Sequence, residues 1–191
     1  MRKMDKIVVV DCEGTCWEGL QRIAGQLPRS EESEIIEVGV CLLDLKTLQV
    51  SDVAGIFVKP VRTTVSKFCT ELTTITQEQL DLVGVPLVDA CTRLKKEYDS
   101  KNRMWASYGN YDKNIFERNC KELGIGYPFG NAHLNIKGVF ETLFGETLGM
   151  TRALDRMKMK LEGTHHRGCD DARNTALLYG KFLEKARHNF K

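Results

Sequence analysis

A short apolar run near the start of the chain constrains the fold more than any other feature. Residues 7–10 read Ile-Val-Val-Val and are followed at once by acidic residues. Because every position is apolar and β-branched, the run predicts a strand buried on both faces, in the centre of a sheet. Two further β-rich segments, residues 34–44 and 54–59, are separated by a polar turn, and Pro60 ends the second. The three segments together predict an antiparallel unit.

From residue 86 onward, helical segments alternate with strand-like ones. Apolar residues recur at helical spacing from Leu87 to Tyr98, and residues 104–106 read as a strand. Further helices are predicted around residues 115–123, 139–144, 150–161 and 170–186. A surface loop is predicted at residues 19–33. Strands followed by helix and strand in alternation favour an α/β domain with a mixed sheet.

Composition bounds the class of protein. At 191 residues the chain is expected to form one domain, residues 1–191. Its 28 Lys and Arg residues nearly balance 26 Asp and Glu residues, so the net charge of +2 gives no sign of a broad nucleic-acid-binding surface. No apolar run reaches the roughly 18 residues of a membrane helix, and no signal peptide is apparent, which predicts a cytoplasmic protein. The seven cysteines form no C-x-x-C pair and are expected to be reduced.

Two carboxylates follow the first predicted strand. Asp11 and Glu13 are two residues apart, so their side chains project from the same face. Neighbouring carboxylates repel each other, and a divalent cation, which prefers oxygen ligands, would offset that repulsion. The alternative is a polar turn in which both side chains are solvated.

Two later segments add further candidate groups. Asp112 lies between a predicted strand and a predicted helix, where an acidic residue can also simply complement the helix dipole. Residues 164–171 read Thr-His-His-Arg-Gly-Cys-Asp-Asp and precede an amphipathic helix. A histidine five residues before an aspartate suits a general base held beside a metal-bound water. The alternative is an Asp N-cap with incidental histidines.

Together these groups form an ordered set: D-x-E, a middle Asp, and a late H-x-x-x-x-D. In this order the whole chain resembles the 3′→5′ exonuclease superfamily of ribonuclease H-like fold, in its histidine-containing DEDDh branch. It looks closest to the enhanced-RNA-interference-type and KapD-like exonucleases. The resemblance implies a mixed five-stranded sheet, with three antiparallel strands and then parallel ones, flanked by helices. The segments that carry it are DCEGTC at 11–16, EIIEVG at 34–39, VKP at 58–60, FCTELTTITQEQ at 68–79 and HRGCDDARN at 166–174.

The resemblance also implies a two-metal site. Two divalent ions would be bound, Mg²⁺ by preference with Mn²⁺ as a substitute. His166 would be the general base. The four metal ligands would be the carboxylates of Asp11, Glu13, Asp112 and Asp171.

The position of the histidine depends on the register of the motif. His165 precedes Asp170 by the same spacing at which His166 precedes Asp171. The resemblance selects His166 and Asp171, because Asp171 then places Ala172 where the family has small helix residues.

Substrate-binding residues are implied in the same way. Leu72 and Ile75 would lie against the terminal bases, since apolar packing on base faces tolerates any sequence. The alternative is that both belong to the core of a short helix. Thr15 would lie near the terminal ribose. Arg167 belongs to a basic cluster that would contact phosphate. The alternative is that the cluster is a solvated helix face. The other members of this cluster are Arg152, Arg156, Lys158 and Lys160.

These expectations describe a metal-dependent 3′→5′ exonuclease. It would hydrolyse single-stranded RNA or short oligonucleotides from the 3′ end and release nucleoside 5′-monophosphates. The expected partner is a single-stranded 3′ end, RNA being favoured over DNA by the subfamily resemblance alone, and a protein partner for substrate recruitment is an option. Two alternatives stay open: a DNA-trimming or proofreading exonuclease, and a regulatory binding protein on the same fold. The second would be expected to lack a metal carboxylate or the histidine.

Overall fold

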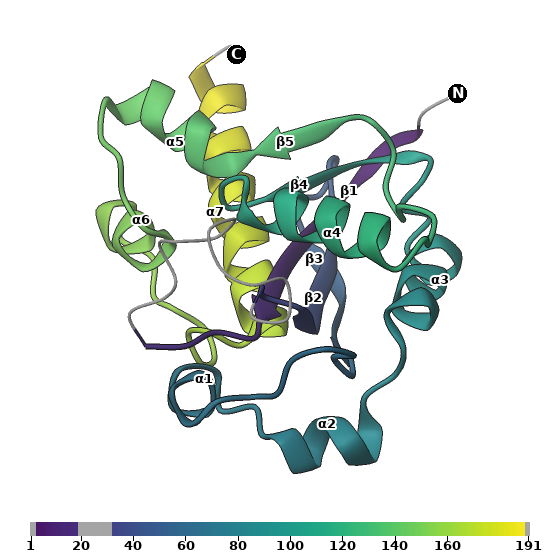
Figure 1. The fold of residues 1–191 in the computed structure, drawn as a ribbon. Coiled ribbons are helices and arrows are strands. Elements are labelled where there is room, and N and C mark those ends of the chain that lie inside the picture. The colour runs from purple at the N-terminus through teal and green to yellow at the C-terminus, as the bar shows by residue number, and fades with distance from the viewer. Residues whose placement is uncertain (1–2, 19–31, 190–191) are drawn as a thin grey trace.

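A mixed five-stranded sheet forms the centre of the computed structural model (Figure 1). The structure describes residues 3–18 and 32–189, so the predicted loop at 19–33 lies outside the described residues except at its end. The first three strands pair antiparallel, and the other two join parallel, which confirms the predicted fold class. In the order β3-β2-β1-β4-β5, the strands are β1 (Lys3–Gly14), β2 (Ile35–Asp44), β3 (Val50–Phe57), β4 (Arg103–Ser107) and β5 (His133–Asn135).

The alternation of side chains along β1 divides the interior into two cores. Val8 and Val10 point into one core, Ile7 and Val9 into the other, and all four are buried. Burial of each such side chain stabilises the fold by roughly 1.5–3 kcal/mol. The first core is covered by α3 (Leu87–Glu97) and α4 (Tyr111–Glu122). The second is covered by α5 (Ile136–Phe144), α6 (Met150–Arg156) and α7 (Gly168–Asn189).

Two short helices lie beyond one end of the sheet, α1 (Lys67–Thr73) and α2 (Gln77–Val83) (Figure 1). Each begins at a hydroxyl cap, because Ser66 accepts a hydrogen bond from Cys69 N and Thr76 accepts one from Gln79 N. Among the described residues, no helix is both long enough and apolar enough to cross a membrane.

Several predicted elements differ in extent from the observed ones, and α4, α5 and α7 each begin earlier than predicted. The basic helix predicted at 150–161 ends at Arg156, because Lys158 adopts a left-handed φ of 57° and Met159 N bonds back to Leu154 O at 2.9 Å. The third strand starts at Val50 rather than at residue 54.

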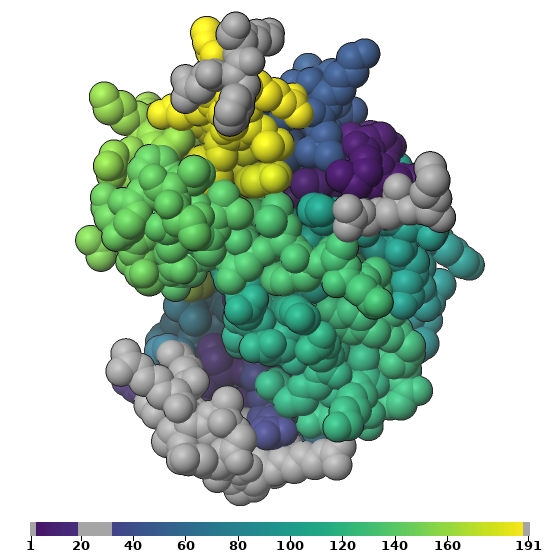
Figure 2. Space-filling model, turned by 90° about the horizontal axis from the view of Figure 1, so that it is seen from above, coloured from purple at the N-terminus to yellow at the C-terminus, as the bar shows by residue number. Residues whose placement is uncertain are grey.

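The start of α7 lies directly against β2. A Cβ atom on Gly39 would come within 1.8 Å of the main chain of Gly168, so only glycine allows this approach. At its other end, α7 reaches the hairpin between β2 and β3, where Arg187 donates a hydrogen bond to Leu45 O. Figure 2 shows this yellow end of α7 beside the blue hairpin and the purple start of β1. The helix is thus fixed across the sheet at both ends.

Candidate active site

A cleft of about 480 Å³ opens where β1 ends. Its walls come from β1, α1, α4, α6 and the segment leading into α7. All four predicted metal-binding carboxylates and both histidines line it. These residues are Asp11, Glu13, Asp112, His165, His166 and Asp171.

The four carboxylates meet although they come from three elements. Asp11 and Glu13 lie on β1, and one carboxylate oxygen of each lies within 4.8 Å of one on Asp171, in the first turn of α7. Asp112, in the first turn of α4, is tied to β1 because Cys12 N donates to its Oδ1 at 2.7 Å. The predicted cluster is therefore assembled in space.

Burial raises the pKa of every carboxyl group in this cluster, and repulsion between the carboxylates adds to this for Asp11, Glu13 and Asp112. The pKa of Asp11 lies well above its ordinary value, first because the group is buried and then because Asp112 is close. Burial raises the pKa of Glu13 to about 8 and that of Asp112 to about 6. Burial likewise raises the pKa of Asp171. Such a cluster is unfavourable when ionised and alone.

The donor set fits divalent cations. It consists of carboxylate oxygens with two imidazoles at one side, and no Lys or Arg among the described residues forms an ion pair with any of the four carboxylates. Hard cations such as Mg²⁺ and Mn²⁺ prefer oxygen ligands and would neutralise the buried charge. The four carboxylates are the residues that would hold them.

The acidic cluster gives the metal-free protein a characteristic pH dependence. Glu13 has a pKa of about 8 in the folded state and an ordinary one near 4.5 when unfolded. Between these values the folded state holds a proton that the unfolded state lacks, so the free energy of unfolding falls as pH rises through this range. We expect the Tm of the protein in chelator to fall between about pH 6 and about pH 8.5, and Glu13→Gln to reduce that fall.

Thermal melts across this pH range check the prediction. Added Mg²⁺ should recover Tm at the alkaline end, since a ligand that binds only the folded state stabilises it. A Glu13→Gln variant whose Tm falls as steeply as that of the parent protein would contradict the assignment to Glu13.

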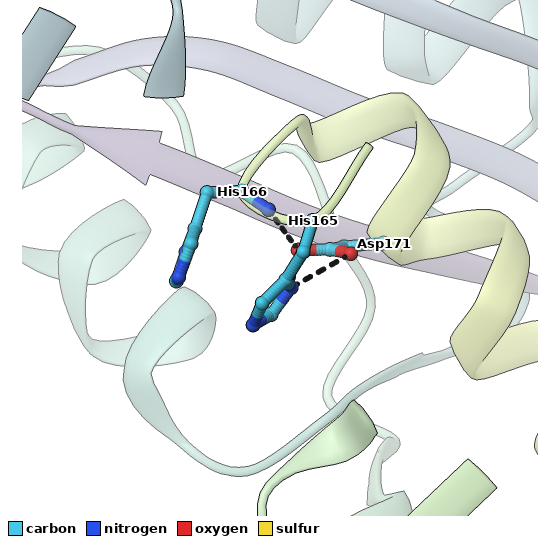
Figure 3. Close-up of side chains that lie close together, drawn as sticks. All are labelled: His165, His166 and Asp171. Carbon is cyan, nitrogen blue, oxygen red and sulfur yellow. Dashed lines mark hydrogen bonds and ion pairs between the residues drawn. The ribbon is translucent and has the colours of Figure 1, made fainter. Parts of the chain in front are cut away.

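The two histidines lie differently towards Asp171 (Figure 3). His165 Nδ1 is 2.9 Å from Asp171 Oδ2, and His166 contacts the same oxygen through its main-chain N–H at 2.9 Å. The His166 ring points away from the carboxylate and stacks on the His165 ring, with centroids 3.9 Å apart. Burial, followed by the neighbouring charge of His165, lowers the pKa of His166. A neutral His166 ring is what a general base requires.

The structure separates the two registers of the motif. Asp170 does not line the cleft, and its carboxylate accepts a hydrogen bond from Thr164 N at 2.8 Å. Asp171 is the aspartate that joins the cluster. The segment is also fastened by Asn174, fully buried, whose side chain exchanges hydrogen bonds with the main chain of Glu162.

Arg167 does not occupy the position predicted for it. It does not line the cleft, and its guanidinium pairs with Glu37, a fully buried carboxylate on β2, with Nε 3.3 Å from Oε2. Gly168 N donates to the same oxygen at 2.9 Å. The predicted phosphate contact of Arg167 therefore has no support here, since this charge is used to hold the start of α7 against the sheet. The exposed cluster at residues 152–160 does not line the cleft either.

Of the other residues predicted to bind substrate, two line the cleft and one lies in the core. Leu72 lines the cleft. Ile75 is fully buried in a core cluster with Ile36 and Leu80, so for this residue the alternative of a core position holds. Thr15 lines the cleft, but its hydroxyl is engaged within the protein, 3.0 Å from the Thr63 hydroxyl and accepting from Glu34 N.

Several lining residues were not identified from the sequence. Tyr108 and Tyr111 shortly precede Asp112 in the sequence, and that proximity is the signal by which they could have been found. Trp17 directly follows the segment at 11–16 and has the same signal. Arg118 and Met150, which also line the cleft, have no such signal.

Known proteins are similar to this chain in sequence. A family model described as Exonuclease matches residues 8–179. Human 3′-5′ exoribonuclease 1 is 30% identical over 191 residues, covering 94% of this chain and 53% of the relative. The probable 3′-5′ exonuclease KapD of Bacillus subtilis is 27% identical over 186 residues, covering 95% of this chain and 85% of KapD.

A solved structure has the same fold. The nuclease domain of 3′hExo, a DEDDh family member bound to rAMP, superposes with a TM-score of 0.82 at 27% identity, covering 97% of this chain and 95% of that one. This chain spans about half the length of human exoribonuclease 1 and 28% of a longer human relative, ERI1 exoribonuclease 2. Because the family model spans all five strands of the sheet almost completely, this chain belongs to the exonuclease family and is a relative of its DEDDh members.

Proposed function

We propose that this protein is a metal-dependent 3′→5′ exonuclease that acts on single-stranded RNA and releases nucleoside 5′-monophosphates. The observation that carries the proposal is that four carboxylates, three of them buried and that of Asp11 partly buried, meet in one cleft with a histidine. The ring of this histidine, His166, makes no hydrogen bond within the described residues. Preference for RNA rests on the similarity to human 3′-5′ exoribonuclease 1. A cytoplasmic location and a protein partner for substrate recruitment belong to the same proposal and rest on the sequence.

The residues of the cleft supply distinct parts of the reaction. Divalent ions, when bound by the carboxylates, would neutralise the scissile phosphate and make the attacking water more acidic. His166 accepts the proton that this water loses, since its ring nitrogens have no hydrogen bond within the described part of the chain. The hydrogen bond from His166 N to Asp171 keeps base and carboxylate in fixed relation. Leu72 packs against the terminal base.

A binding protein on the same fold is disfavoured by the same site. Loss of catalysis on this fold would be expected to remove a metal ligand or the base, whereas all four carboxylates and His166 line the cleft here. The alternative of a DNA-trimming enzyme is tested directly by comparing single-stranded RNA with single-stranded DNA as substrates.

The proposal predicts metal-dependent shortening from one end. Single-stranded RNA labelled at its 5′ end should give a descending ladder with Mg²⁺ or Mn²⁺, and the same strand labelled at its 3′ end should release labelled mononucleotide at once. Excess chelator should abolish both, because the carboxylates alone cannot neutralise the phosphate.

The matched substrate is single-stranded DNA of the same sequence, which should be shortened more slowly. Shortening that starts at the 5′ end, or that persists in chelator, would contradict the proposed function. Equal rates on both strands would remove only the RNA preference.

A further inference from the structure

Positive charge is scarce in the cleft. A strand of nucleic acid carries one negative charge per phosphate, so a binding cleft normally presents Lys or Arg to it. Among the described residues that line this cleft, Arg118 is the one Lys or Arg side chain. Arg167 is paired with Glu37, and the cluster at residues 152–160 lies elsewhere.

The guanidinium of Arg118 is largely unused within the protein. Its Nη2 donates to Ser33 O, and its Nε is buried without a hydrogen-bond partner in the part of the chain that the structure describes. No described carboxylate forms an ion pair with it, whereas Arg62 and Arg103 each pair with two. Arginine has five N–H donors in a planar fork that matches phosphate oxygens. Most of these donors remain for a ligand.

The position of Arg118 indicates which anion it would meet. It lies on α4 six residues after Asp112, which is roughly 9 Å along a helix axis. Seven residues after Tyr111, it shares that residue's face of the helix, and both line the cleft. Under the proposed function the scissile phosphate would lie at the acidic cluster, whereas Arg118 lies more than one helical turn beyond Asp112 and its guanidinium is bonded to Ser33 O.

Resting on the proposed function, we propose that Arg118 binds a phosphate on the 5′ side of the scissile bond. An enzyme that removes the 3′-terminal nucleotide has no phosphate beyond the scissile one in the 3′ direction, because that nucleotide ends in a hydroxyl group. Every further phosphate of the substrate is therefore on the 5′ side. By this contact Arg118 would raise kcat/KM for a nucleic-acid strand relative to a substrate that has a single phosphodiester.

Two substrates separate this role from catalysis. The p-nitrophenyl ester of thymidine 5′-monophosphate has one phosphate, whereas a single-stranded oligoribonucleotide has many. We expect Arg118→Ala to lower the ratio of kcat/KM for the oligonucleotide to that for the ester about tenfold, corresponding to about 1.4 kcal/mol. The slope of log kcat/KM against log salt for the oligonucleotide should become shallower by roughly 0.7. Arg118→Lys should keep the slope and recover part of the ratio.

Matched controls address folding and charge. Lys121 lies on the same helix, is exposed and does not line the cleft, so Lys121→Ala should leave both the ratio and the slope unchanged. Ser33 O keeps a donor in Arg118→Ala, since Asn119 Nδ2 lies 3.3 Å from it, and Tm should verify that the variant is folded. An unchanged ratio, or an equal loss on both substrates, would overturn the proposal.

Failure of the proposed function would look different. It would appear as a parent protein that hydrolyses neither substrate in Mg²⁺ or Mn²⁺. Fluorescence anisotropy with the labelled oligoribonucleotide would then test Arg118 independently of turnover. Binding weakened about tenfold in Arg118→Ala would support the phosphate contact, and unchanged binding would overturn it.

Discussion

Asp11→Asn is expected to lower kcat on single-stranded RNA by roughly four orders of magnitude. Asp11 belongs to the cluster, because one of its carboxylate oxygens lies within 4.8 Å of one on Glu13 and one on Asp171. Loss of one charged ligand weakens cation binding and removes several kcal/mol of transition-state stabilisation, and each 1.36 kcal/mol is a factor of ten in rate. Gel-resolved single-turnover assays across a range of Mg²⁺ concentrations measure the effect.

The same substitution should stabilise the metal-free fold. The pKa of Asp11 is raised by burial and by neighbouring carboxylates, so a neutral amide relieves an unfavourable charge. A variant that is inactive and yet melts at a higher temperature in chelator cannot be dismissed as misfolded. Asp155→Asn is the matched control, since Asp155 is exposed and does not line the cleft, and it should change neither property. Near-normal turnover by Asp11→Asn at ordinary Mg²⁺ would contradict the metal site.

His166→Ala is expected to lower kcat by roughly 10²- to 10⁴-fold, the usual contribution of a general base. His165→Ala should cost much less, because the His165 ring is already engaged with Asp171 while the His166 ring is free to take a proton. The two rings stack, so each variant also serves as the other's control for local packing.

The pH profile of kcat should show which of the two histidines is the general base. The acid limb of the profile should vanish in His166→Ala and persist in His165→Ala, since that limb reports protonation of the base. The reverse result, with His165→Ala inactive and His166→Ala active, would show that the register of the motif was assigned to the wrong histidine.

The acidic cluster could be predicted because each of its parts has a local signature. Asp11 and Glu13 follow an apolar strand, and Asp112 opens a helix after another strand. The resemblance supplied their convergence, which no local pattern could, since α7 meets β1 only through long-range packing. The register of Asp171 was also chosen by resemblance, and the structure agrees because Asp171 alone of the two aspartates lines the cleft.

Arg167 and Ile75 lie away from the cleft for related physical reasons, since the place of each depends on a contact that is distant in sequence or on a turn. Arg167 lies close in sequence to other basic residues, but its partner Glu37 is on a distant strand. Ile75 and Leu72 are both aliphatic and close in sequence. Thr74, which lies between them, ends α1 in a left-handed conformation with φ 64°. That reversal directs Ile75 into the core and leaves Leu72 at the cleft.

The division of the site between β1 and α7 has a consequence for the protein during its synthesis. A nascent chain presents Asp11 and Glu13 early, but it cannot bring Asp171 and His166 to them until α7 has left the ribosome and packed across the sheet. Folding during translation proceeds from the N-terminus. Under the proposed function, partly synthesised chains and products of premature termination are therefore inert towards the messages around them.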